Sequence, residues 1–252
     1  MVSGAPYSTG VAACGSDICK MRVGHMASML GGMGLPGRDA ELVQIVDAAL
    51  GDAARRAGEG LACRVGCTQC CHGAFVINAL DAARLGAGMA VLRETEPGLA
   101  AEIERRARGW IAEHGADFPG DLKTGRLGET AEEQERFEEF ANEAACPALD
   151  PGTGRCDVYA WRPMTCRVFG PPVRMDGEGK DGSGGGLGHC ELCFVGAGQD
   201  VVEACEMAVP HELEAAVLDE VGDAGETVVA FAVLEAGNRE QGTGKREKQT
   251  GG

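Results

Sequence analysis

The chain has 252 residues, of which 44% are hydrophobic and 25% charged, and its formal net charge is −16. This length and composition allow a globular protein with a real core, whereas the acidity argues against nucleic acid phosphates or an anionic membrane as partners. No apolar run approaches the roughly 18 to 20 residues that a membrane helix needs. Two residue types are unusually frequent, with 40 Gly and 12 Cys. We therefore expect long loops and thiols with a chemical role.

Residues 1–38 predict a flexible N-terminal segment, because they are rich in Gly, Ser and Ala and show no lasting periodicity. They contain no charged region followed by an apolar stretch, so no secretory signal is visible and a cytoplasmic location is expected. Thiols in that reducing compartment are more often ligands or redox groups than disulfides. Cys14 and Cys19 lie in this segment at a spacing that indicates no site, and several Met leave the start codon open.

Apolar residues at intervals of three and four predict helices along the rest of the chain. The first begins at the N-cap candidate Asp39 and ends at Gly58. Later helical patterns run over residues 78–92, 99–111 and 129–145 and from Pro210 onward. The many Glu of 129–145 are interpreted as a solvated face opposite an apolar stripe. The apolar run 227–234 fits either a buried helix or a strand.

These patterns predict a mainly α fold, with short β segments and a single helical domain over residues 39–236. Its core, residues 63–193, is expected to hold Cys-rich irregular loops around a metal site. The glycine-rich stretch 176–188 predicts a flexible loop. The polar tail 237–252 is expected to be disordered.

The densest cysteine motif is C-x3-C-x2-C-C, formed by Cys63, Cys67, Cys70 and Cys71. Two or three intervening residues let a turn direct successive sulfurs to one ion, and Gly66 frees the backbone to bend. Adjacent side chains diverge in helix and strand alike, so the vicinal pair serves one centre only from a tight turn. Otherwise its two thiols serve two centres.

Three further cysteines follow downstream, with nine residues between neighbours: Cys146, Cys156 and Cys166. Pro163 predicts the first turn of a short helix that carries Cys166. Arg162 and Arg167 flank these thiols, and two roles are open for them. They offset thiolate charge beside a metal, or they pair with the abundant acids. We predict that the downstream thiols converge with the first four on one site, because each set alone is too short to enclose a cation.

Cys190 and Cys193 form a C-x2-C pair after the glycine-rich loop. As ligands they would close the site from the far side, and as a pair on their own they would suit redox chemistry. Cys205 is predicted to be a buried thiol without a ligand role. His72 and His189 adjoin cysteines, and imidazole binds zinc or iron. The thiols already suffice, however, so neither His is expected to be needed.

These motifs, in this order, resemble the YkgJ-type cysteine-cluster family of bacteria, whose members are described as zinc- or iron-chelating domains. The hallmarks of that family are a C-x3-C-x2-C-C run, a Cys-Pro, a Cys that opens a short strand, and an R-P-x-x-C-R-x-F element. Their matches in this chain are 63–71, 146–147, 156–159 and 162–169. The resemblance implies a metal-binding domain but no particular reaction. Flagellin lysine N-methylase, a distant relative, is similar in carrying such a cluster.

The number of candidate thiols bears on the metal. One zinc takes four ligands, so nine thiols fit two zincs, or an iron–sulfur cluster such as [4Fe–4S] with spare thiols. Short C-x2-C spacing favours zinc, and an all-thiolate set favours iron. Three functions follow: a structural or storing metal-binding domain, a cluster-dependent transferase similar to the lysine N-methylase, or a thiol redox sensor. No catalytic residue and no nucleotide or S-adenosylmethionine site is visible, and a sizeable polar pocket beside the cluster would favour the enzyme.

Overall fold

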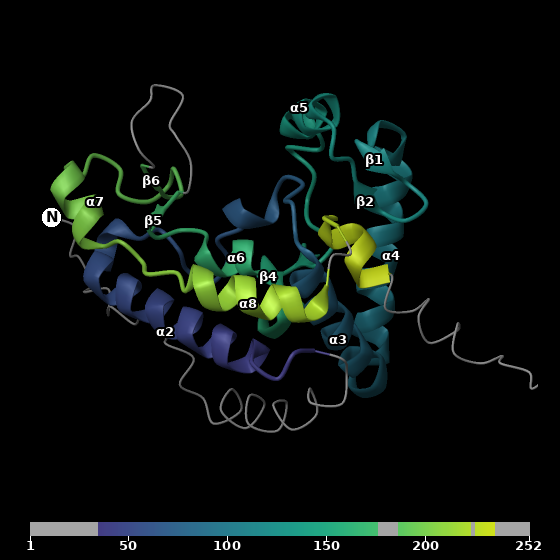
Figure 1. Ribbon diagram of the computed structural model, residues 1–252, viewed down its shortest axis with the longest axis horizontal. Helices are drawn as coiled ribbons and strands as arrows, with labels where there is room; N and C mark the ends of the chain where they lie inside the picture. The colour runs from purple at the N-terminus through teal and green to yellow at the C-terminus, as the bar shows by residue number, and fades with distance from the viewer. Residues whose placement is uncertain (1–34, 176–185, 223–224, 235–252) are drawn as a thin grey trace, which may run out of the picture.

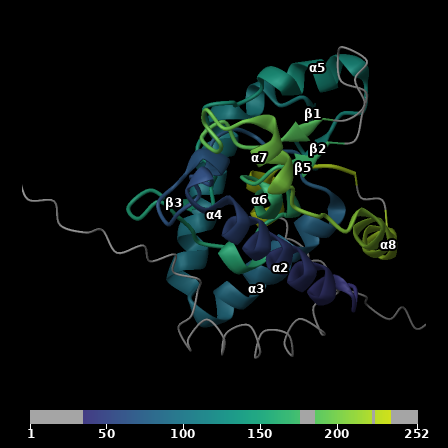
Figure 2. The same ribbon diagram turned by 90° about the vertical axis from the view of Figure 1, so that its left-hand side faces the viewer.

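Helices form most of this computed structural model, as two perpendicular views show (Figure 1, Figure 2). The residues that it describes are 35–175, 186–222 and 225–234. Within those ranges each strand is two residues long, and the strands pair as antiparallel hairpins. The prediction of a mainly α fold with short β segments is confirmed.

Some of the predictions fall on parts of the chain that the structure does not describe. These parts are residues 1–34 with Cys14 and Cys19, the loop 176–185, the pair 223–224 and the tail 235–252. Within the described ranges, none of the helices has the length and apolar character needed to cross a membrane.

Helix α2, Asp39–Ala57, matches the first predicted helix, with Leu42 among its buried residues. The chain leaves it at Gly58, where φ is 52°, a left-handed conformation that favours Gly. The prediction for Asp39 differs from the structure in one respect. Its side chain caps no helical N–H, because its carboxylate instead accepts hydrogen bonds from the buried Arg84.

Helices α3, Ala79–Thr95, and α4, Pro97–His114, lie side by side and supply much of the core (Figure 1). The Asn78 side chain caps α3 by accepting a hydrogen bond from a first-turn N–H at 2.9 Å. Gly88 on α3 leaves room for Trp161, because a Cβ at that position would lie 2.5 Å from atoms of the indole ring. The chain just before the third downstream cysteine is thereby packed against α3.

Helix α5, Ala131–Glu139, is shorter than the predicted helix over 129–145. The chain leaves it through Ala141, which has a φ of 51°. Phe140 is thereby buried, and its ring packs edge-on against Trp110 and Phe118. The apolar stripe read as helical therefore ends in an aromatic cluster, which offers more burial than another helical turn.

The apolar run 227–234 is divided between the two predicted alternatives. Thr227 forms an antiparallel bridge with Ile77, and residues 229–234 are helical.

The remaining elements are α6 (Met164–Val168), α7 (Gln199–Ala204), α8 (His211–Val221), β1 (Gly120–Asp121) with β2 (Arg126–Leu127), β3 (Leu149–Asp150) with β4 (Arg155–Cys156), and β5 (Val173–Arg174) with β6 (Leu187–Gly188).

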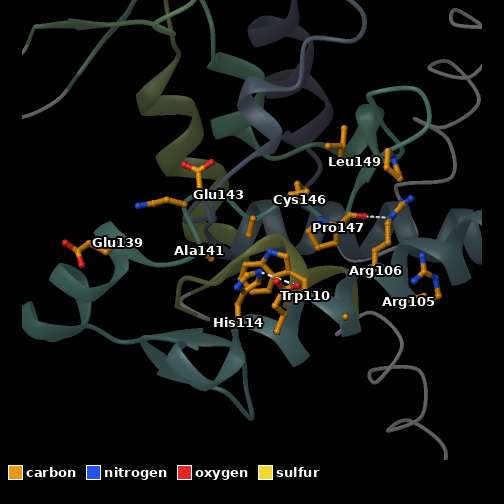
Figure 3. A pocket seen from close by; sticks show the side chains of 16 residues that line it. Arg105, Arg106, Trp110, His114, Glu139, Ala141, Glu143, Cys146, Pro147 and Leu149 are labelled. Carbon is orange, nitrogen blue, oxygen red and sulfur yellow. Dashed lines mark hydrogen bonds and ion pairs between the residues drawn. The ribbon is translucent and has the colours of Figure 1, made fainter.

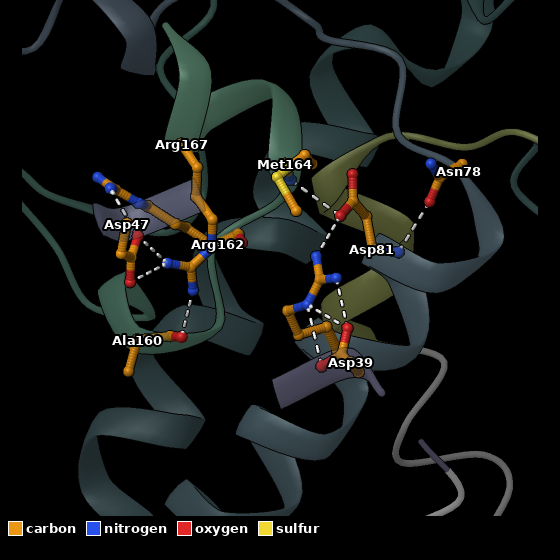
Figure 4. A network of polar contacts seen from close by, with 9 residues as sticks. Asp39, Asp47, Asn78, Asp81, Ala160, Arg162, Met164 and Arg167 are labelled. Carbon is orange, nitrogen blue, oxygen red and sulfur yellow. Dashed lines mark hydrogen bonds and ion pairs between the residues drawn. The ribbon is translucent and has the colours of Figure 1, made fainter. Parts of the chain in front are cut away.

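A buried ion-pair network joins α2, α3 and α6 (Figure 4). The Arg84 guanidinium donates to the Asp39 carboxylate at 2.6 Å and also pairs with Asp81. Asp81 in turn accepts a hydrogen bond at 2.9 Å from the N–H of Met164, the first residue of α6. Burial raises the pKa of Asp81, so its charge depends on the neighbouring guanidinium. This network therefore fixes the position of the first residue of α6, and with it the position of Cys166 two residues later.

Candidate metal centre

The loop that carries the first cysteines is built from two tight turns. In the first turn, the Cys67 N–H donates to the Arg64 carbonyl at 2.9 Å, and Gly66 supplies a left-handed φ of 89°. The second turn is a 3₁₀ segment, Gln69–Cys71, which contains both vicinal thiols. The vicinal pair therefore lies in the tight turn that a shared centre requires.

Backbone pairing carries the vicinal pair to the downstream thiols. The Cys146 N–H donates to the Cys71 carbonyl at 2.8 Å. The β3–β4 hairpin then returns the chain, and β4 ends at Cys156. The predicted short helix is α6, with Pro163 immediately before it and Cys166 as its third residue. Three separate segments are thus brought to one place by hydrogen bonds of the backbone and by the buried network.

Five thiols gather there, and we call them the five-thiol set: Cys70, Cys71, Cys146, Cys156 and Cys166. The thiols that act most strongly on Cys166 are Cys146, Cys70 and Cys156. Burial raises the pKa of Cys146 to about 12 and the pKa of Cys156 to about 11, and neighbouring thiols add to both increases. Each of these sulfurs is thus surrounded chiefly by protein and by other sulfurs.

Four other thiols gather separately, and we call them the four-thiol set: Cys63, Cys67, Cys190 and Cys193. The Cys63 thiol is in hydrogen-bonding contact with the Cys193 thiol, and Cys67 and Cys190 are its other thiol neighbours. Burial, followed by these neighbours, raises the pKa of Cys63 above its ordinary value. The pKa of Cys190 is also raised, and burial is again the largest cause.

This grouping differs from the single site that the sequence predicted. Cys70 and Cys71 lie with the downstream thiols as expected, whereas Cys63 and Cys67 lie with the C-x2-C pair. All ten cysteines in the described ranges are free thiols. As they are placed, no three His, Cys, Asp or Glu side chains of the described residues are close enough to hold a metal ion. Binding of one ion by either set would require its sulfurs to move closer together.

The other residues weighed in the sequence have different surroundings. Cys205 is 4% exposed and lies in an apolar cluster that also contains Phe194 and Val202, which agrees with its predicted burial. The backbone of His72 forms a β-bridge. The Nδ1 atom of His189 lies 3.0 Å from the carbonyl oxygen of the next residue.

Arg167, the second of the two arginines near the downstream thiols, pairs with an acid. Its guanidinium donates to Asp47 at 2.7 Å and to the Ala160 carbonyl at 2.6 Å (Figure 4). These bonds tie α6 to α2 and to the turn before it. The role of Arg167 is therefore to hold the cysteine-bearing segment in place.

Arg162 also reaches Asp47, with 3.8 Å between nitrogen and oxygen, but it lies beside the thiols. A hydrogen bond with Cys71 is the largest cause of the lowered pKa of Cys70, and the positive charge of Arg162 lowers it further. The same charge opposes the increase in the pKa of Cys156 that burial causes. The guanidinium lies 4.1 Å from the centre of the Tyr159 ring, and its buried Nε has no hydrogen-bond partner among the described residues. A buried donor without an acceptor is costly, and a metal thiolate or a sulfide would supply the acceptor.

The residues present therefore suit a thiophilic metal. Thiolates are soft ligands that select zinc, iron–sulfur clusters or copper(I). Several thiolates around one cation leave a net negative charge, which Arg162 is placed to offset. A bound zinc or iron ion would form strong bonds to sulfurs from segments that lie far apart in the sequence, and would so join these segments.

Replacing Arg162 with Met is expected to weaken metal affinity by roughly 10–100-fold, the effect typical of groups that support metal ligands. The guanidinium is the charge that acts on Cys70 and Cys156. Competition with a chromophoric chelator measures the affinity. Arg167→Met is the matched control, because it also removes a positive charge and a contact with Asp47 from the same segment, but Arg167 is not among the charges that act on Cys70 and Cys156. It should lower the melting temperature and leave affinity within a few-fold, and equal losses of affinity in both variants would contradict the distinction.

An open cavity of about 740 Å³ adjoins the five-thiol set (Figure 3). Cys146 and Pro147 line it, together with Trp110 and His114 of α4. Arg106, also in its wall, donates to the Pro147 carbonyl at 2.8 Å. The acidic residues of the lining are Glu113, Glu139 and Glu143. A sizeable pocket with several polar side chains in a largely apolar lining thus lies beside the five-thiol set, and the enzyme hypothesis requires such polar groups.

The helical fold and the gathered thiols define a cysteine-cluster domain. Residues 62–177 match the model of the CxxCxxCC family, which is described as a "Putative zinc- or iron-chelating domain", so this region of the chain is similar to that family. The match contains the five-thiol set but ends before Cys190 and Cys193. No curated protein and no solved structure matched the chain.

Proposed function

We propose that this protein binds zinc or iron through nine thiolates, and that the metal joins loops that are distant in the sequence. The proposed ligands are Cys63, Cys67, Cys70, Cys71, Cys146, Cys156, Cys166, Cys190 and Cys193. The observation that carries the proposal is their gathering into two sets of free thiols. The family description and the unpartnered Nε of Arg162 also support it.

The two candidate metals make different demands on the five-thiol set. A zinc ion uses four ligands and would leave one thiol over. A [4Fe–4S] cluster also takes four thiolates, and its sulfides accept hydrogen bonds, which suits the buried donor of Arg162. A reducing compartment such as the cytoplasm would keep all nine thiols available.

Metal and acid-labile sulfide analysis of the purified full chain tests the proposal. Half of one culture is purified in air and half without oxygen, since iron–sulfur clusters decay on oxidation. We expect zinc or iron in both halves or, for a cluster, iron with equivalent sulfide in the anaerobic half. Protein that contains neither metal, and that takes up neither during anaerobic reconstitution, would contradict the proposal.

Metal affinity is expected to rise with pH. The pKa of Cys146 is about 12 and that of Cys156 about 11, so without metal both thiols hold their protons at neutral pH. Binding must release those protons, and each proton released makes the affinity rise by up to about tenfold per pH unit. Chelator competition at several pH values around neutrality measures the slope. An affinity independent of pH would mean that the buried thiols are not ligands.

The cavity beside Cys146 favours a second candidate, group transfer next to the cluster. Glu113, Glu139 and Glu143 would attract a cationic side chain such as lysine, the group that the N-methylase relative modifies. Transfer of a labelled methyl group from S-adenosylmethionine to a lysine peptide tests this candidate. Glu143→Gln should reduce transfer, and no transfer by the metal-loaded protein would leave metal binding as the function.

A further inference from the structure

The two sets of thiols are joined through the chain but have separate surroundings. The cysteine loop contributes Cys63 and Cys67 to the four-thiol set, and three residues later it contributes Cys70 and Cys71 to the other set. The thiols that act most strongly on Cys63 and Cys190 belong to the four-thiol set. Those that act most strongly on Cys71 and Cys166 belong to the five-thiol set.

Each half of the four-thiol set is shaped by a tight turn. The Cys67 N–H donates to the Arg64 carbonyl at 2.9 Å, and the Cys193 N–H donates to the Cys190 carbonyl at 2.8 Å. A left-handed residue accompanies each turn, Gly66 in the first and Phe194 after the second. Such turns let two cysteines separated by two or three residues direct their sulfurs to one point.

Backbone and side-chain contacts hold the two turns together. The Phe194 N–H donates to the Gly60 carbonyl at 2.7 Å, which places the C-x2-C turn against the start of the cysteine loop. Gln69 donates to Glu191 at 2.9 Å across the same junction. The Cys63 sulfur lies so close to Gly170 that a Cβ there would come within 2.7 Å of it. The four sulfurs are thus brought together by more than their own contacts.

We propose that the nine thiols hold two separate metal centres, and that Cys63, Cys67, Cys190 and Cys193 form a tetrahedral four-thiolate site for one zinc ion. This proposal rests on the proposed metal-binding function. Four thiolates in C-x3-C and C-x2-C pairs meet the ligand number and spacing of structural zinc sites. Only two of these four ligands, Cys63 and Cys67, lie within the matched 62–177 region. This centre would therefore link residues 190–193 to that region.

Cobalt(II) titration of the full chain without oxygen tests the proposal, because cobalt replaces zinc and its absorption reports tetrahedral thiolate ligation. We expect wild-type protein to bind at least two ions per chain, one of them with a four-thiolate spectrum. Cys193→Ser should lose that ion and keep the other, whereas Cys156→Ser should keep the four-thiolate ion. Cys205→Ser is the matched control, because Cys205 is buried in the same apolar cluster as Cys193 but is outside the set.

Four results would overturn the two-centre proposal. If Cys193→Ser and Cys156→Ser each abolish all binding while the control retains it, the nine thiols share one centre. If Cys193→Ser changes nothing, the C-x2-C pair is only part of an apolar cluster. The wild-type titration does not depend on whether the variants fold, and saturation at one ion contradicts two centres by itself. If wild-type protein binds no ion, the metal-binding function fails as well, so the two failures are distinguishable.

Discussion

Removing the metal is expected to lower the melting temperature of this protein by on the order of 10 °C. The proposed ligands tie residues 63–71 to the 146–166 segment and to the C-x2-C turn. Metal held in this way contributes folding free energy, on the order of several kcal/mol. In a domain of this size each kcal/mol shifts the melting temperature by roughly 2–4 °C. Thermal melts with and without a strong chelator, under reducing conditions, measure the shift.

Single substitutions separate the metal from other effects of the chelator. Cys67→Ser and Cys166→Ser should lower metal content and melting temperature together, since each removes a proposed ligand. Cys14→Ser and Cys19→Ser are the matched controls and should change neither quantity. If Cys67→Ser and Cys166→Ser keep full metal and an unchanged melting temperature, the metal does not join these loops, and a thiol redox role becomes the better account.

The second large effect is expected from Arg84→Ala, which should lower the free energy of unfolding by about 3–5 kcal/mol. Arg84 is 2% exposed and pairs with both Asp39 and Asp81. The substitution leaves two buried carboxylates without a partner and frees the network that positions Met164 at the start of α6. Urea denaturation at neutral pH measures the loss.

The pH dependence and a surface control identify the cause of that loss. Burial already raises the pKa of Asp81 above its value in the unfolded chain, and removing Arg84 raises it further. A raised pKa favours the folded state while the group is protonated, so the variant should recover stability as the pH falls. Arg105→Ala breaks an exposed pair with Glu102 and should have little effect. Equal effects of the two substitutions would contradict the role given to the buried network.

The sequence predicted the helices well because their apolar residues recur at helical spacing, as in α2, where Leu42, Val46 and Ala53 are buried. The end of α5 was not predictable in this way. The predicted apolar stripe continues past Phe140 to Ala145, but the helix ends at Glu139, where the chain turns to bury Phe140 beside Trp110. The buried ion pair between Asp39 and Arg84 was also missed, because the two residues are 45 positions apart in the sequence. An Asp at the start of a helix, moreover, was already explained locally as an N-cap.

The cysteines of the candidate site could be predicted from the sequence, but their division into two sets could not. Spacing identifies Cys63, Cys67, Cys70 and Cys71 as one motif, whereas their grouping depends on which loops fold back upon them. One signal was present in the sequence. Nine candidate thiols exceed the four ligands that one zinc takes, which already made two centres feasible. That the division falls between Cys67 and Cys70 required the three-dimensional structure.

X-ray absorption at the zinc or iron edge tests the central claim most directly, because it reports which atoms surround the metal in the intact protein. Thiolate ligation predicts a first shell made of sulfur, at roughly 2.3 Å for zinc. It should contain about four sulfur atoms per metal and little nitrogen or oxygen, since His72 and His189 are not expected to be ligands. A first shell of nitrogen and oxygen at roughly 2.0–2.2 Å would contradict the account, because the gathered cysteines would then not be what holds the metal.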